Sequence, residues 1–130
     1  MRDGMARGRR GVRRNLDMQL ARMVSKPDDR ATVRAWGVAS DPGVAARFLY
    51  EDVLFDLRPD LAQLRTPIIL LYPDNVPSGV PAGAMDATYP ALHAAAPSVK
   101  THRVDNALHF IMLDQPEAFA KELDTFLAAK

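Results

Sequence analysis

The sequence predicts an α/β fold, in which neighbouring parallel strands are flanked by helices. Residues 68–72 form a continuous apolar run of strand length, as expected for a strand that is covered on both faces. Residues 100–104 contain β-branched side chains and are predicted to form a second strand. A helix is expected between them at residues 83–95, kinked or restarted at Pro90. A strand, a helix and a strand in this order form a right-handed crossover, so the two strands should lie side by side and parallel.

The composition is that of an ordinary folded domain. The chain has 130 residues, enough to bury a core, a net charge of +1 and no cysteine. The small charge argues against a general attraction to nucleic acid or membranes. Without cysteine there are no disulfides, thiolate metal sites or cysteine nucleophiles. No apolar run could span a bilayer, and no apolar signal segment follows the early arginines, so we expect a soluble, cytoplasmic protein with no membrane partner.

Residues 1–15 form a basic arm. The arm holds six arginines opposed by Asp3 alone, and its glycines make it a poor helix before Val12. Such an arm could bind nucleic acid or resemble a transit peptide. However, no aromatic side chain alternates with the arginines to stack on bases. A solvated terminus is therefore favoured, and nucleic-acid binding is the weaker alternative.

Three short helices are expected between this arm and the first strand. The first covers residues 16–24, where apolar side chains recur on one helix face. A second helix follows Pro27, with Asp28 or Asp29 as its cap. A third begins at Asp41, a good cap with proline behind it. Its expected buried residues are Val44, Phe48, Leu49, Tyr50 and Val53. Together the helices suit either a lid over an apolar pocket or an ordinary helical core.

His109 lies in the loop between the second predicted strand and the last helix. A histidine at the carboxyl end of a strand is where a base can meet a nucleophile, at the rim of an α/β sheet. The next helix is predicted at residues 115–128, because Asp114 and Glu117 form an Asp-x-x-Glu capping box and Pro116 fits the first turn. The residues expected on its buried side are Phe119, Leu123, Phe126 and Leu127.

Two stretches resemble motifs of the α/β-hydrolase superfamily. The first is His109-Phe110 followed by Met112-Leu113-Asp114-Gln115-Pro116-Glu117-Ala118-Phe119, which is similar to the family's last motif. The second is residues 56–67 with the apolar run 68–72, which resembles the approach to the strand of the triad acid. The resemblance implies a partial α/β-hydrolase fold that contains the last two parallel strands and their flanking helices. Residues 1–55 would be a helical cap remnant with the basic arm, and residues 56–130 the C-terminal core segment.

The resemblance also implies roles for two side chains. In the family the histidine is the triad base and follows the last strand, while the acid follows the strand before it. His109 would therefore be the base and Asp74, the first carboxylate after residue 72, the acid that orients it. Asp86, twelve residues beyond Asp74, is the competing acid, and a helix cap is its alternative role. The chain departs from the family at Pro73 and Leu108, where glycine is common.

The family's nucleophile has no counterpart in the sequence. It belongs to a Gly-x-Ser-x-Gly turn, and none of the serines at 25, 40, 78 and 98 lies between glycines. An aspartate turn at residues 39–43 fits the spacing, but Pro42 lacks the N–H that would bind an oxyanion. We therefore expect the C-terminal portion of a hydrolase, a fragment that is inactive alone. The intact enzyme would cleave an ester or related acyl bond of a small apolar substrate.

No cofactor is implied, and the chain has no metal-ligand spacing such as His-x-x-x-His. The alternative to the hydrolase interpretation is a noncatalytic α/β domain. Such a domain would associate with another chain, or with itself, through the open edge of its sheet.

Overall fold

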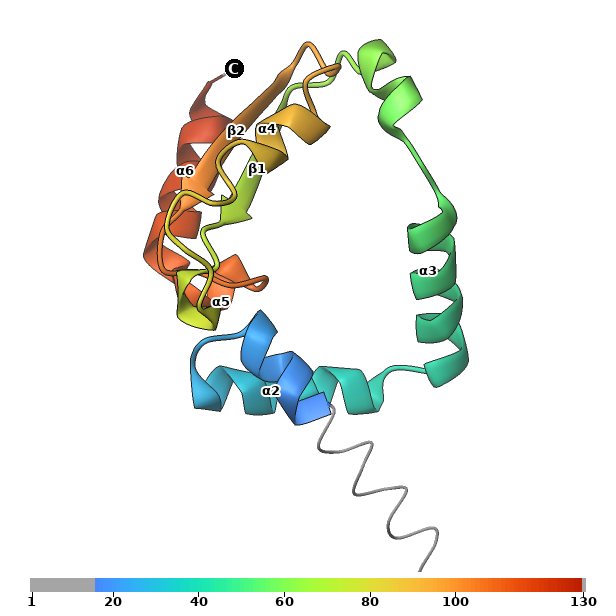
Figure 1. Ribbon diagram of the computed structural model, residues 1–130, viewed down its shortest axis with the longest axis vertical. Helices are drawn as coiled ribbons and strands as arrows, with labels where there is room; N and C mark the ends of the chain where they lie inside the picture. Colours follow the sequence, from blue (N-terminus) through green and yellow to red (C-terminus); the bar gives the residue numbers. More distant parts are fainter. Residues whose placement is uncertain (1–15, 130) are drawn as a thin grey trace, which may run out of the picture.

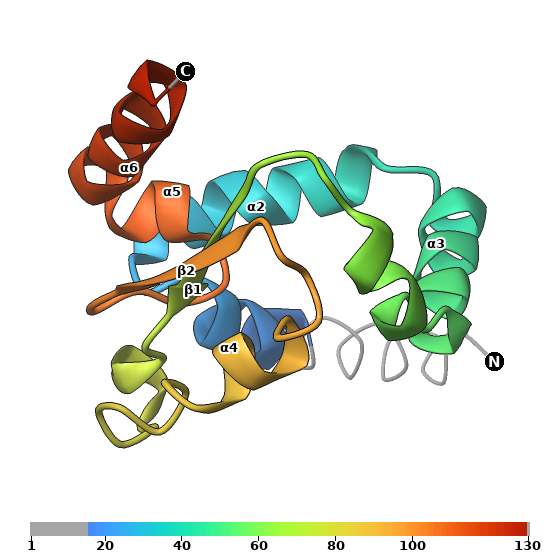
Figure 2. The ribbon, with the colours of Figure 1, turned by 90° about the horizontal axis from the view of Figure 1, so that it is seen from above.

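The computed structural model describes residues 16–129, so the predicted basic arm lies outside the described residues. The fold is mixed α/β, with a two-stranded parallel sheet and several helices (Figures 1 and 2). The first helix among the described residues covers residues 16–23. The elements that follow are α2 (Pro27–Ala39), α3 (Pro42–Leu54), η1 (Arg58–Gln63), β1 (Ile68–Pro73), η2 (Val76–Ser78), α4 (Thr88–Leu92), β2 (Val99–Val104), α5 (Ile111–Asp114) and α6 (Pro116–Ala128).

Strands β1 and β2 lie side by side and parallel, which confirms the predicted pairing. Their register runs from Ile68 opposite Val99 to Pro73 opposite Val104. The helices α4 and α6 lie on opposite sides of the strands (Figure 2). Because both strands run in the same direction, the loops that carry Asp74 and His109 leave the sheet at the same end.

The crossover between the strands contains less helix than the sequence predicts. The expected helix at residues 83–95 is reduced to α4, with turns on either side of it. Pro90 explains the start of α4, because a proline is tolerated in the first turn of a helix but not further in. Gly83 has a φ of +79°, a left-handed conformation that interrupts the chain before the helix.

The core consists of two clusters. The first joins the helix at 16–23 to α2 through the buried Leu20, Val24 and Val33. Phe110, the residue before α5, and Leu113 within α5 pack against this first cluster. The second cluster lies between the sheet and α6. Its members are Val104, Ala107 and Ile111, with Leu71, Ala118 and Phe119 packed against them.

Helix α3 begins as predicted, but its expected buried side is exposed. The Asp41 side chain accepts a hydrogen bond from the N–H of Val44 at 2.9 Å and so caps the helix. No residue of α3 is buried, and the apolar side chains Phe48 and Val53 are 70 % and 75 % exposed. The helix stands apart from the sheet in both views (Figures 1 and 2), so the described elements do not cover its apolar side.

The start of α6 also differs from the prediction. Gln115 is the residue at the N-cap, and it makes no capping hydrogen bond through its side chain. Asp114 belongs to α5 and is buried, with its carboxylate directed to other partners. Of the apolar side chains expected to be buried on α6, Phe119 and Phe126 are half-buried, whereas Leu123 and Leu127 are exposed.

Candidate functional site

His109 is exposed and lines an apolar hollow. After β2 the chain turns at Asn106, which has a φ of 55°, and then buries Ala107 and Leu108 completely. His109 follows them and is exposed. Its ring lies edge-on to Phe110, with the ring centroids 5.2 Å apart. The histidine is thus held by a buried backbone while its imidazole remains accessible.

The hollow has a volume of about 320 Å³ and lies between the sheet and α6. Ile69 and Leu71 line it from β1, and Phe119 and Leu123 line it from α6. His109 is the one titratable side chain among its lining residues. A hollow of this kind can accept a small apolar group beside an imidazole.

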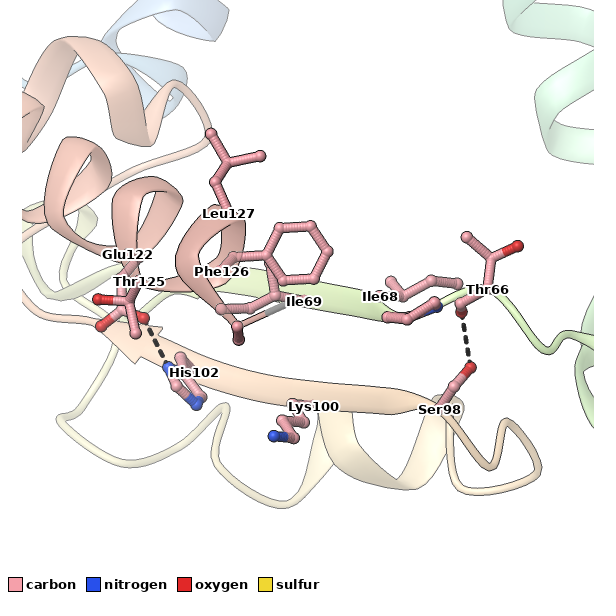
Figure 3. Close-up of a pocket in the computed structure, with 12 residues that line it drawn as sticks. Thr66, Ile68, Ile69, Ser98, Lys100, His102, Glu122, Thr125, Phe126 and Leu127 are labelled. Carbon is pink, nitrogen blue, oxygen red and sulfur yellow. Dashed lines mark hydrogen bonds and ion pairs between the residues drawn. The ribbon is translucent and has the colours of Figure 1, made fainter.

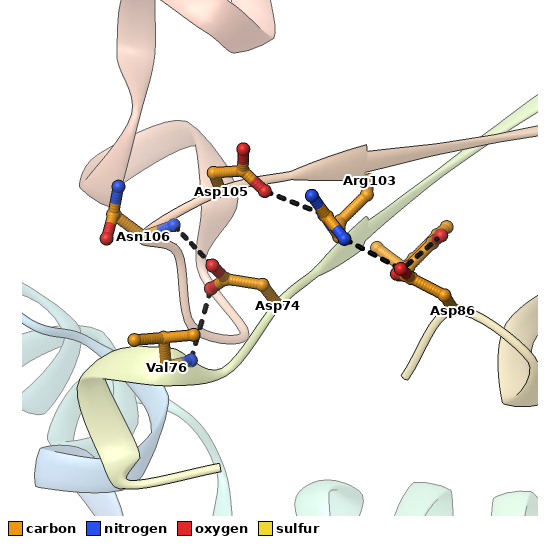
Figure 4. A network of polar contacts seen from close by, with 7 residues as sticks. Asp74, Val76, Asp86, Arg103, Asp105 and Asn106 are labelled. Carbon is orange, nitrogen blue, oxygen red and sulfur yellow. Dashed lines mark hydrogen bonds and ion pairs between the residues drawn. The ribbon is translucent and has the colours of Figure 1, made fainter. Parts of the chain in front are cut away.

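Asp74 lies at the junction of the two loops. It is 5 % exposed, and each of its carboxylate oxygens accepts one hydrogen bond (Figure 4). The N–H of Val76 donates to Oδ1 at 3.1 Å, and the N–H of Asn106 donates to Oδ2 at 2.9 Å. A carboxylate oxygen has two lone pairs, so Asp74 retains capacity to accept a further bond.

The triad geometry stays a prediction. Among the described residues, the His109 ring has no hydrogen bond to either Asp74 or Asp86. Asp74 and His109 come from loops at the same end of the sheet, which agrees with the expected placement. The hydrogen bond that the His109 imidazole N–H would donate to the Asp74 carboxylate is therefore the part of the assignment that stays a prediction.

Asp86, the competing acid, has structural partners. Arg103 Nη1 donates to its Oδ2 at 2.7 Å (Figure 4). The Tyr72 hydroxyl donates to its Oδ1 at 3.3 Å. Arg103 also bonds to Asp105 through Nε at 2.7 Å. Tyr72 stacks on Tyr89 of α4, with ring centroids 4.9 Å apart. Asp86 is therefore held on the α4 side of the sheet, away from the hollow that His109 lines.

Burial and the neighbouring carboxylate change the acidity of Tyr72. The pKa of the Tyr72 hydroxyl is raised mainly by desolvation, because burial disfavours the charged phenolate. The charge and hydrogen bond of Asp86 raise the pKa further, while the positive charge of Arg103 opposes them. Tyr72 therefore stays protonated and donates to Asp86 at neutral pH.

The four serine hydroxyls are all engaged elsewhere. Ser25 donates to the carboxylate of Asp114 at 2.7 Å. Ser40, Ser78 and Ser98 donate to backbone carbonyls at 2.9, 2.9 and 2.7 Å. None of these partners is His109, so the arrangement offers no serine that the imidazole could activate.

A larger hollow of about 520 Å³ lies near the start of the strands (Figure 3). Ile68, Ile69 and Phe126 form its apolar part, and His102 bonds to Glu122 at its side at 2.7 Å. Neither His109 nor Asp74 lines this hollow, so we do not assign it to the candidate site.

Within residues 16–129, no group of three or more His, Cys, Asp or Glu side chains could hold a metal ion. In the same part of the chain, no helix combines the length and apolarity needed to cross a membrane. The predicted cytoplasmic location stays a prediction.

Comparisons of the chain with models of protein families, with curated proteins and with solved structures find no match. The structure therefore assigns the protein to a structural class, mixed α/β with a parallel pair of strands, and the comparisons add no family to it.

Sequence reasoning missed the role of Asp114. The pattern Asp-x-x-Glu in front of an apolar helix indicates a capping box. The carboxylate instead binds the backbone of Leu108 and both donors of Ser25, which is 89 residues away in the chain. A contact over such a separation leaves no local pattern in a single sequence.

Proposed function

We propose that this chain is the acid-and-histidine portion of an α/β hydrolase, which cleaves an ester or related acyl bond of a small apolar substrate. The observation that carries the proposal is the exposed His109 beside an apolar hollow, in a loop next to the buried Asp74. The motif around His109 and the parallel pair of strands support it as well.

In the proposed reaction His109 acts as general base. It accepts the proton of a nucleophilic hydroxyl while the oxygen adds to the substrate's carbonyl carbon, and it returns that proton to the leaving alcohol. A water molecule then attacks the acyl intermediate in the same way and releases the acid. Asp74 would hold the imidazole in the productive tautomer and stabilise its charged form. In this proposal the nucleophilic hydroxyl belongs to a Gly-x-Ser-x-Gly turn in a separate part of the enzyme, because this chain has no such turn.

The first experiment measures hydrolysis of a short p-nitrophenyl ester by the purified chain. We expect no turnover above background, and the same rate for His109→Ala. Turnover that His109→Ala abolishes would mean that the chain carries a nucleophile of its own, which contradicts the proposal as stated.

The second experiment mixes the chain with a separately produced α/β-hydrolase fragment that carries a Gly-x-Ser-x-Gly turn. We expect ester hydrolysis to appear and to fall about 10²- to 10⁴-fold with His109→Ala, the usual range for losing a general base. Asp74→Asn should also lower the rate, whereas Asp86→Asn should leave it nearly unchanged because Asp86 is bound to Arg103 and Tyr72. Rates that do not depend on His109 would refute the proposed role.

A second candidate function is noncatalytic association through the sheet edge. In the part of the chain that the structure describes, β1 pairs with β2 alone, so its other edge has unpaired backbone groups. Sedimentation at increasing concentration tests for self-association. Hydrogen exchange then tests the edge: amides of β1 that do not bond to β2 should become protected in the associated form. Exchange as fast as in the monomer would exclude this edge as the interface.

A further inference from the structure

The carboxylate of Asp114 is buried between two distant parts of the chain. Its side chain is 3 % exposed. Oδ1 accepts hydrogen bonds from the N–H of Ser25 at 2.9 Å and from its hydroxyl at 2.7 Å. Oδ2 accepts a bond from the N–H of Leu108 at 2.7 Å. Asp114 therefore connects the turn before α2 to the residue directly in front of His109.

The residue directly after His109 is tied to the same helical segment. The N–H of Phe110 donates to the carbonyl of Met23 at 3.1 Å. The Phe110 side chain packs against the first core cluster, and its ring lies 6.4 Å from that of Trp36 in α2. The backbone is thus held on both sides of His109 by residues 16–39, while the imidazole itself stays free to face the hollow.

We propose that Asp114 is a positioning residue for His109. By binding Leu108 and Ser25 together, its carboxylate fixes the backbone from which the imidazole projects. Residues 16–39 thereby become a structural part of the histidine's site. That His109 acts as a base rests on the proposed function, whereas its positioning rests on the hydrogen bonds alone.

The chemistry of the three bonds requires a carboxylate. The N–H groups of Ser25 and Leu108 are donors only, and they approach different oxygens of Asp114. An asparagine at this position has one oxygen and one NH₂ group, so one backbone N–H would face another donor. A buried donor without an acceptor is costly. Asp114→Asn should therefore loosen one of the two segments with almost no change in side-chain volume.

Three histidines in the chain make the test specific. We would compare ¹H–¹³C spectra of the imidazole rings in the unmodified chain, in Asp114→Asn and in Ser25→Ala. His93 and His102 are internal references, because they bond to the carbonyl of Tyr89 and to Glu122, away from Asp114. Asp124→Asn, at an exposed position on α6, is the matched control for the loss of one carboxylate.

With Asp114→Asn we expect the His109 resonances to shift or broaden while those of His93 and His102 stay in place. Protection of the Leu108 amide from hydrogen exchange should fall roughly tenfold or more, the effect of losing one buried hydrogen bond. Ser25→Ala removes only one of the three bonds and should give a smaller change in the same direction. Asp124→Asn should change neither measurement.

A folded Asp114→Asn variant with unchanged His109 resonances and unchanged protection of Leu108 would overturn the proposal. If that variant does not fold, Ser25→Ala decides: unchanged His109 resonances overturn the proposal, and shifted ones support it. These spectra need no substrate, so their outcome is separate from that of the ester experiments. Shifted His109 resonances would keep the positioning role even if hydrolysis by the mixture with the Gly-x-Ser-x-Gly fragment proved independent of His109, a result that would refute only the proposed function.

Discussion

The Oδ2 atom of Asp74 accepts a hydrogen bond from the backbone N–H of Asn106 at 2.9 Å, which joins the two loops at the end of the sheet (Figure 4). A backbone bond from the N–H of Asn75 to the carbonyl of Ala107, at 3.1 Å, reinforces this connection. Asn75 and Asn106 both have positive φ values, 59° and 55°, which asparagine tolerates better than most residues. The loop that carries His109 is therefore fixed to the end of β1.

Asp74→Asn should destabilise the fold. The amide that replaces the carboxylate leaves the N–H of either Val76 or Asn106 without an acceptor, at an expected cost of about 1–3 kcal/mol. Urea unfolding followed by circular dichroism measures this cost. Asp124→Asn on the exposed side of α6 is the control and should unfold as the unmodified chain does. Equal stabilities of the two variants would show that the bonds of Asp74 contribute little.

The parallel pair of strands could be predicted from the sequence because both of its determinants are local. A continuous apolar run and a β-branched run have the right length for strands. Two strands joined by a helical crossover are then expected to lie parallel, with a right-handed connection. The cap of α3 at Asp41 was predictable for the same reason, since it bonds to a backbone group three residues away.

The surroundings of the site depend on contacts between distant residues, which a single sequence does not reveal. Asp114 has the sequence pattern of a helix cap, but its carboxylate accepts hydrogen bonds from Ser25 and Leu108 instead of capping α6. The apolar side of α3 suggested burial, yet burial needs a second element over that side. Whether Asp74 reaches His109 likewise depends on the path of two loops that no local pattern fixes.

Leu108→Ala should be among the most destabilising substitutions in this region. The Leu108 side chain is fully buried, and it supports the backbone directly in front of His109. Removing it leaves a cavity, for which losses of about 2–5 kcal/mol are usual. Urea unfolding compares it with Leu127→Ala, which shortens a leucine that is 53 % exposed and should cost much less. Similar losses for the two variants would contradict the burial of Leu108.

Tyr72 should make the stability of the folded chain fall at alkaline pH. The pKa of Tyr72 is raised, first by burial and then by the charge of Asp86, so the folded chain holds the phenolic proton more tightly than the unfolded chain. The resulting stabilisation is complete below the pKa of an unfolded tyrosine, about 10, and is lost as the pH rises through the higher pKa of the folded state.

Asp86→Asn should lower the pKa of Tyr72 in the folded chain without restoring its usual value, because burial persists. Arg103→Gln should raise it, because Arg103 opposes the effect of Asp86. A pH titration of the ring carbon of Tyr72 bonded to oxygen, followed by ¹³C NMR, measures both shifts, and shifts of the same sign would contradict the electrostatic explanation.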